Sequence, residues 1–178
     1  PAVYVLRLAE SKARAARWLS RGDELILAAD TTVADGSAIL GKPSGPEEAV
    51  DMLLRLRGRW HEVHTAIALF RPQDGLLVTD LCTTSVPMRD YSLPEVVDYV
   101  SSGDPLDKAG AYAIQHAAFH PVETLTGCFA SVMGLPLCHL VRTLSTMSVQ
   151  PPEGIPQACQ ADLHYRCPIF DRVLIGQK

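Results

Sequence analysis

The segment LILAADTTVADGSAILGKP, residues 25–43, indicates most clearly how this chain folds. It begins with the continuous apolar run Leu25–Ala29, which is typical of a strand buried on both faces. Asp30 ends that run. Farther on, the pair Asp35-Gly36 lies between apolar residues, which is the sequence signal of a tight β-hairpin. The segment therefore predicts a buried strand with a carboxylate at its end, followed by a hairpin.

Helices are predicted on both sides of this segment. Residues 1–20 carry apolar positions near helical spacing with basic residues between them, and Gly22 ends that pattern. A second helix is expected after residue 43. Ser44 and Glu47 have the spacing of a capping box at its start, and Gly58 closes it.

The middle of the chain alternates strands with a further helix. Two strands are expected near residues 62–70 and 76–86, joined by a polar turn. Ser92 and Glu95 repeat the capping-box spacing before a helix that ends at Gly103. This mixture of strands, hairpins and helices indicates an α/β domain.

The last third of the chain gives weaker signals. Residues 104–115 are expected to form a loop that leads into a short strand, and another strand is expected before Gly134. A helix follows over residues 135–144. After Ser148 the chain is rich in proline and loses periodicity, so an irregular segment is predicted there.

Composition narrows the class of protein. A chain of 178 residues with 47% hydrophobic and 20% charged residues fits one globular domain. The net charge of −4 argues against a broad nucleic-acid-binding surface, and neither a membrane-spanning run nor a signal peptide is apparent. Cysteines at irregular spacing favour free thiols in the cytoplasm; a zinc clip of Cys159, His164 and Cys167 is the weaker interpretation. The five cysteines are Cys82, Cys128, Cys138, Cys159 and Cys167.

A few polar residues are placed where chemistry could occur. Asp30 follows a buried strand, so it could hold a divalent cation or accept a proton from water, or it could only cap a turn. Lys42 lies between a glycine and a proline, where it could contact phosphate or simply be solvated. Lys12 and Lys108 are similarly ambiguous. Gln115 could read the edge of a nucleobase or bridge two backbone segments. By pattern alone, the prediction is an α/β domain with a site for an anionic ligand.

Several phrases in fixed order resemble the Maf family of nucleotide pyrophosphatases. P-loop, dinucleotide-binding and serine-hydrolase motifs are absent from the sequence. The matching phrases run from Arg7 to Leu144, and their order makes the resemblance specific. They are Arg7-Leu8-Ala9 with Lys12-Ala13, Ala29–Val33, Gly41-Lys42-Pro43, Leu56–Arg59 with His61–Thr65, Asp107–Gln115, and Gly134–Leu137.

The resemblance implies an elongated α/β fold, related to the inosine triphosphate pyrophosphatases. That fold has a mixed sheet with flanking helices, and its two lobes enclose a nucleotide cleft. Residues 1–148 are expected to form the Maf-like domain and residues 149–178 an irregular extension. Members of the family begin with a strand and a Ser-x-Ser-Pro-Arg-Arg phosphate loop, and the present sequence starts after the corresponding point.

The resemblance also implies a reaction and its residues. Family members cleave the α–β bond of a nucleoside triphosphate with Mg²⁺ or Mn²⁺, releasing the monophosphate and pyrophosphate. Asp30 corresponds to the essential carboxylate, as general base or metal ligand. Lys12, Lys42 and Lys108 correspond to lysines that face the phosphates. Such cations offset the charge that develops during in-line attack by water.

Two positions suggest the substrate. Thr31 after Asp30, and Gln115 in the later phrase, are similar to the dTTP/UTP branch, so both are expected to bind substrate. A pyrophosphatase for another nucleotide, such as 7-methyl-GTP, is the alternative within the same chemistry. A catalytically impaired nucleotide-binding regulator linked to cell division is the alternative of another class. The resemblance further implies a homodimer, because relatives often pair. The net charge and the lack of a membrane-spanning run argue against nucleic-acid and membrane partners.

Overall fold

The protein is described by a computed structural model covering residues 1–22 and 24–176, and its centre is a four-stranded sheet. The strand order is β2-β1-β3-β4, and each of these pairings is antiparallel. The α/β class, the hairpin at Gly36 and the two strands expected near residues 62–70 and 76–86 are thereby confirmed. The resemblance implied a mixed sheet, whereas every pairing in this sheet is antiparallel. The strands are β1 (Ile26–Asp35), β2 (Ala38–Leu40), β3 (Trp60–Arg71) and β4 (Leu76–Pro87).

The first strand differs from its prediction in length and burial. β1 does not stop at Asp30, which pairs with Ala66 in the middle of the ladder with β3. The apolar run is not buried on both faces, since Leu27 is 41% exposed. Side chains alternate between the faces of a sheet, so a carboxylate can sit in mid-strand when its side faces a polar cavity. Asp30 is therefore held by a strand rather than by a turn.

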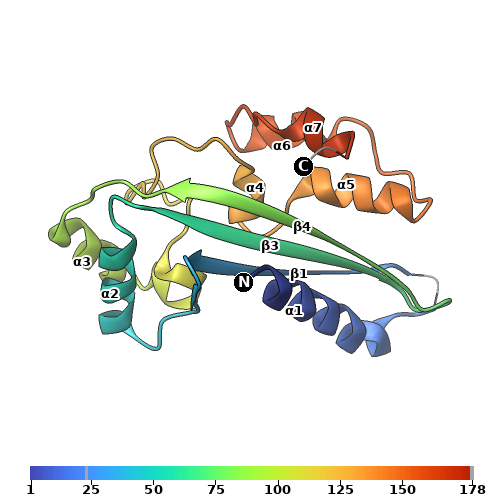
Figure 1. Cartoon of the computed structure of the whole chain (residues 1–178), viewed down its shortest axis with the longest axis horizontal. Coiled ribbons are helices and arrows are strands. Elements are labelled where there is room, and N and C mark those ends of the chain that lie inside the picture. Colours follow the sequence, from blue (N-terminus) through green and yellow to red (C-terminus); the bar gives the residue numbers. More distant parts are fainter. Residues whose placement is uncertain (23, 177–178) are drawn as a thin grey trace.

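Helices cover both faces of the sheet (Figure 1). Helix α1 (Ala2–Ala15), extended by a 3₁₀ turn (Ala16–Leu19), confirms the first predicted helix. It buries Val5, Ala9 and Ala13 against alanines and Phe70 of β3, where small side chains allow helix and sheet to approach closely. On the opposite side lie α4 (Phe129–Val132) and α5 (Leu137–Thr146), with the later helices beyond them.

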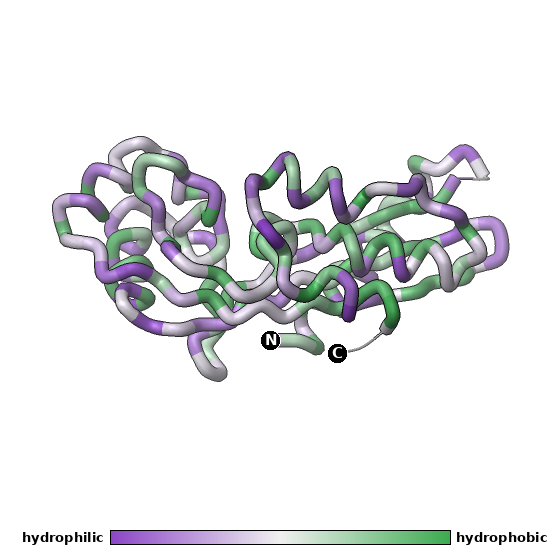
Figure 2. The backbone as a smooth tube through the Cα atoms, turned by 90° about the horizontal axis from the view of Figure 1, so that it is seen from above, coloured by the Kyte–Doolittle hydropathy of each residue, from purple (hydrophilic) through white to green (hydrophobic). Residues whose placement is uncertain are grey.

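A second hydrophobic core lies at one end of the strands. It is built by α2 (Pro46–Leu56), α3 (Leu93–Ser101) and two 3₁₀ turns, η2 (Asp104–Asp107) and η3 (Ala109–Ala111). Tyr91 is fully buried there and donates a hydrogen bond to the Leu53 carbonyl at 2.6 Å. The backbone therefore forms two lobes along the long axis of the molecule, connected through the strands (Figure 2). This elongated, two-lobed shape agrees with the expected fold.

Three local predictions are wrong, each for a backbone reason. Ser44 does not cap α2, because Pro46 takes the first helical position and makes Gly45 the cap; Ser44 contacts Glu48 instead of Glu47. Residues 104–115 form 3₁₀ turns and a loop, since Gly110 and Ala111 have φ values of 70° and 58°, outside the strand region. The segment before Gly134 is the short helix α4, not a strand.

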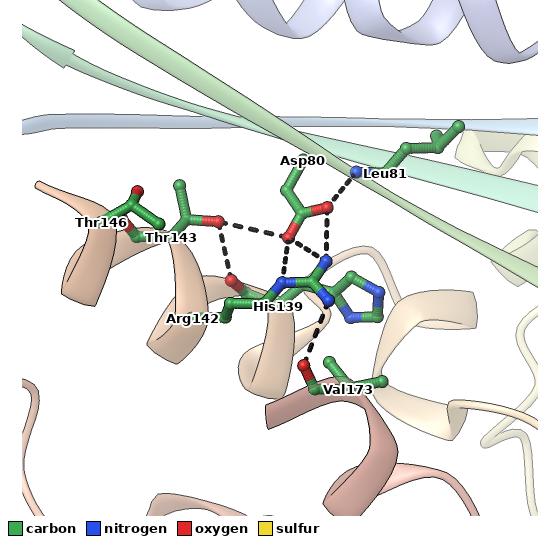
Figure 3. A network of polar contacts seen from close by, with 7 residues as sticks. All are labelled: Asp80, Leu81, His139, Arg142, Thr143, Thr146 and Val173. Atoms are coloured by element: carbon green, nitrogen blue, oxygen red, sulfur yellow. Dashed lines mark hydrogen bonds and ion pairs between the residues drawn. The ribbon is translucent and has the colours of Figure 1, made fainter. Parts of the chain in front are cut away.

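The segment after Ser148 contains two helices where an irregular extension is predicted. They are α6 (Ile155–Asp162) and α7 (Phe170–Leu174), and residues 177–178 lie outside the described part. Arg142 of α5 donates three hydrogen bonds to the Asp80 carboxylate on β4, at 2.6, 2.8 and 3.2 Å, and a fourth to the Val173 carbonyl of α7 at 3.1 Å (Figure 3). One guanidinium thus connects the sheet, α5 and the C-terminal segment.

Candidate functional site

One cavity of about 370 Å³ opens beside β1. All six side chains that the sequence singled out for a site line it, although they come from positions more than a hundred residues apart. They are Lys12, Asp30, Thr31, Lys42, Lys108 and Gln115. The structure therefore brings together every residue of the predicted set.

Asp30 and Lys12 form an ion pair at one side of the cavity. The Lys12 ammonium on α1 contacts the Asp30 carboxylate and lies 3.4 Å from the Ala29 carbonyl. Asp30 is shielded, with 13% of its side chain exposed, whereas 55% of the Lys12 side chain is exposed. Because more than half of the Lys12 side chain is exposed, moving it aside should cost little, and Asp30 is then accessible from the cavity.

Lys108 is held more firmly on the other side. Its ammonium donates to the Asp104 carbonyl and to the Asp107 carboxylate, both at 2.7 Å. Burial favours the neutral amine, but the hydrogen bonds and charges of these two aspartates outweigh it and raise the pKa of Lys108 above its usual value. Hydrogen bonding by Lys108, with help from the charge of Lys42, lowers the pKa of Asp107. The pairs stay charged and fix Lys108 in place.

Tyr99 of α3 positions this lysine from behind. Its hydroxyl donates to the Asp104 carboxylate at 2.6 Å and accepts from the Ala113 amide at 3.0 Å. Its ring stacks on Phe119 with centroids 4.3 Å apart. Tyr99 is 3% exposed, so it is a rigid support that joins the Lys108 turn to the backbone leading to Gln115.

Thr31 lines the cavity from the face of β1 opposite to Asp30. Its hydroxyl lies 2.9 Å from the hydroxyl of Thr65, its cross-strand neighbour on β3. Gly134 passes close to Thr31: a Cβ at residue 134 would lie 3.6 Å from the Thr31 hydroxyl. Gln115 is exposed at the mouth of the cavity. The two positions that suggested the substrate are therefore on one cavity wall and its rim.

The cavity also includes residues that the sequence analysis did not assign to the site. Asp107, Tyr112, Met133 and Gly134 line it. Asp107 adjoins Lys108 in the chain, so a charged pair at that point was the available signal. No charge marks Tyr112 or Met133, and their place in the cavity depends on how distant segments meet. Tyr112 is itself held by a 2.8 Å hydrogen bond to His61.

The carboxylate oxygens of the cavity could hold a divalent cation only together with oxygen atoms from a bound ligand. Asp30 and Asp107 are the two carboxylates that line the cavity. Among residues 1–22 and 24–176, no cluster of three or more metal-ligating side chains occurs. Mg²⁺ is commonly held by one or two carboxylates, waters and substrate phosphates, so this donor set fits a cation that arrives with a phosphorylated substrate.

The arrangement defines the class of the protein: an α/β protein with a cavity lined by three lysines and two carboxylates. Its family follows from the sequence comparison. The model of the family described as "Maf-like protein" matches residues 1–147, and the chain belongs to that family. The resemblance seen in the motifs is thereby confirmed.

Curated relatives agree in their names. A dTTP/UTP pyrophosphatase of Dehalococcoides mccartyi (strain ATCC BAA-2266) is 45% identical over 168 residues, covering 90% of this chain and 74% of the relative. One from Methylobacillus flagellatus is 48% identical, covering 84% and 74%. One from Aquifex aeolicus is 38% identical, covering 84% and 77%. Within the described part of the chain, no helix combines the length and apolar character needed to cross a bilayer.

Proposed function

We propose that this chain hydrolyses nucleoside triphosphates to the monophosphate and pyrophosphate, with dTTP and UTP as favoured substrates. The observation that carries the proposal is the convergence of Lys12, Lys42 and Lys108 on the cavity that holds Asp30. A triphosphate carries several negative charges, and cations spread along it stabilise the charge that develops when water attacks phosphorus. The names of the relatives support the same substrate class.

In this proposal Asp30 orients the attacking water and accepts its proton, or holds the divalent cation. Asp30 would hold Mg²⁺ or Mn²⁺ together with the substrate phosphates, with Asp107 as the second carboxylate in reach of the cavity. When bound, the cation supplies Lewis-acid polarisation of the phosphoryl oxygens. Lys108 is already charged and held beside the cavity, so it can offer positive charge to a phosphate without first gaining a proton. Thr31 and Gln115 contact the base.

The test is pyrophosphate release with Mg²⁺ from dTTP, UTP, CTP and 7-methyl-GTP. We expect dTTP and UTP to be cleaved fastest, and Asp30→Asn to lower kcat by about a hundredfold or more, since it removes a base or metal ligand. Asp98→Asn is the matched control, because Asp98 is an exposed carboxylate on α3 that does not line the cavity. Full activity of Asp30→Asn would contradict the role of Asp30.

The same panel separates the alternatives. Fastest cleavage of 7-methyl-GTP would keep the chemistry and replace the substrate. Binding of nucleotides without any pyrophosphate release would favour the nucleotide-binding regulator. A homodimer remains an expectation from the family resemblance, and a cytoplasmic location remains an expectation from the cysteine pattern.

A further inference from the structure

Two hydroxyl groups and one backbone carbonyl form a chain of hydrogen bonds that leads from the cavity into the core. Thr31 and Thr65 are directly opposite each other on β1 and β3, with their hydroxyl oxygens 2.9 Å apart. Thr65 also lies 2.7 Å from the backbone carbonyl of Ser131. Thr65 and Ser131 are both fully buried, so water does not compete for these bonds.

The direction of each hydrogen bond in this chain is determined. A carbonyl oxygen can only accept, so the single hydroxyl proton of Thr65 is donated to Ser131. Thr65 has no second proton, and its contact with Thr31 therefore requires Thr31 to be the donor. With its own proton directed into the protein, the Thr31 hydroxyl offers only lone pairs to the cavity.

We infer that Thr65 is a positioning residue for base selection, because it fixes Thr31 as an acceptor for the N3–H group of uracil or thymine. This inference rests on the proposed function and deepens it. At the same position cytosine carries a bare nitrogen, which is an acceptor. A buried acceptor facing another acceptor leaves both unpaired, and a site built for one hydrogen bond discriminates strongly against a ligand that lacks it.

The test measures binding without turnover. The α,β-imido analogues of UTP and CTP, which are not cleaved between the α and β phosphates, are titrated calorimetrically into wild type and Thr65→Val. Wild type is expected to prefer the uridine analogue. In Thr65→Val the Thr31 proton is free to turn toward the cavity and donate to cytosine, so the preference should fall about five- to tenfold, the range of one hydrogen bond.

Companion variants separate this effect from general damage. Thr65→Ser keeps the hydroxyl and should keep the preference. Thr84→Val is the matched control on β4: Thr84 is equally buried and hydrogen-bonds the Ser131 hydroxyl at 2.8 Å, outside the Thr31 chain. If Thr65→Val does not fold, Thr31→Val should lower the preference by the same amount; where both fold, the double variant should lower it no further.

The outcomes distinguish this inference from the proposed function. A wild type that binds the cytidine analogue as well or better, or an unchanged preference in Thr65→Val and Thr31→Val, overturns the role of Thr65. Hydrolysis of UTP itself, followed in parallel, tests the reaction alone. Uridine preference that falls in Thr65→Val without any hydrolysis supports the inference and contradicts the reaction.

Discussion

His61 lies on β3 with 3% of its surface exposed, and its Nε2 atom is 2.8 Å from the Tyr112 hydroxyl. Burial lowers the pKa of His61 to about 4, against 6.5 for the free side chain, despite the opposing charge of Asp35. The unfolded chain therefore binds a proton between pH 6.5 and 4 that the folded chain rejects. Stability is complete above pH 6.5 and is lost as the pH falls toward 4, by roughly 2–3 kcal/mol from this group.

The measurement is the free energy of unfolding in urea at pH 7 and pH 5. His61→Gln should flatten the difference between the two values, because glutamine does not titrate. Tyr112→Phe is the matched control: it removes the hydrogen bond and keeps the buried imidazole, so the pH dependence should persist. A steep slope retained in His61→Gln would assign the effect to other groups, of which His64 and His139 also have pKa values lowered by burial.

Single residues of the site differ in how far the sequence could predict them. Asp30 could be singled out from the sequence, because a carboxylate directly after an apolar strand is unusual unless it has a function or caps a turn. Lys12 could not, since it lies among arginines of an amphipathic helix and only contact with Asp30 gives it a role. Thr65 and Tyr99 could not be found as supports, because hydrogen-bond partners across strands and turns are not visible in one sequence. Only the family resemblance grouped the six residues in advance.

At the scale of elements, α3 and α2 show when a capping signal holds. In α3 the Ser92 hydroxyl accepts from the Glu95 amide, and Glu95 accepts from the Ser92 amide at 2.7 Å. In α2 the predicted box fails, and Ser44 instead donates to the exposed Glu48. Ser92→Ala should therefore lower the free energy of unfolding by about 1 kcal/mol, and Ser44→Ala by less than about half of that.

Chemical denaturation of the two variants at pH 7 checks this difference. Equal losses would mean that the two serines stabilise their helices in the same way, contrary to the structure. The two helices also show why helix starts are hard to predict from sequence. The Ser-x-x-Glu spacing is the same in both, and Pro46 moves the start of α2 by one residue. Left-handed backbone at Gly110 had the same effect on the strand expected there.

Tyr99 connects helix α3 to the turns that carry Lys108. Tyr99→Phe keeps the ring stack and removes the two hydrogen bonds that tie Asp104 to the Ala113 backbone. Asp104, a partner of Lys108, is then no longer held, so KM for the triphosphate should rise about three- to tenfold, the range of one lost hydrogen bond, with kcat changed less. Steady-state kinetics measures this split. A fall in kcat alone, at constant KM, would contradict a role in holding Lys108.

On the scale of the whole molecule, the cavity depends on segments that meet only in the folded chain. Helix α1, strand β1 and the turns after α3 all supply side chains to the cavity. The two hydrophobic cores, one under α1 and one around α2 and α3, hold these segments in place. Hydrophobic periodicity predicts each segment separately and says little about how they meet. The α/β class could therefore be predicted from residues alone, whereas the assembled site required the family motifs.

The attachment of the C-terminal segment is a second property of the whole molecule, and Arg142 tests it. The Arg142 side chain is 25% exposed, and its guanidinium joins the Asp80 side chain, which is 17% exposed, to the α7 backbone. Arg142→Met keeps most of the apolar stem and removes every one of these bonds. The free energy of unfolding should fall by on the order of 2 kcal/mol, between the values for exposed and buried ion pairs.

The same variant should release α7 from the sheet. Hydrogen exchange of residues 170–176 is expected to accelerate, while exchange in α1 and β3 follows only the global loss of stability. Arg166→Met is the matched control, because Arg166 is an exposed arginine of the same C-terminal segment, outside this network. None of Asp80, Arg142 and Val173 lines the cavity beside β1, so we expect nucleotide binding to be unchanged. Unchanged exchange in α7 would show that its apolar contacts hold it without Arg142, and the guanidinium would then serve only the ion pair with β4.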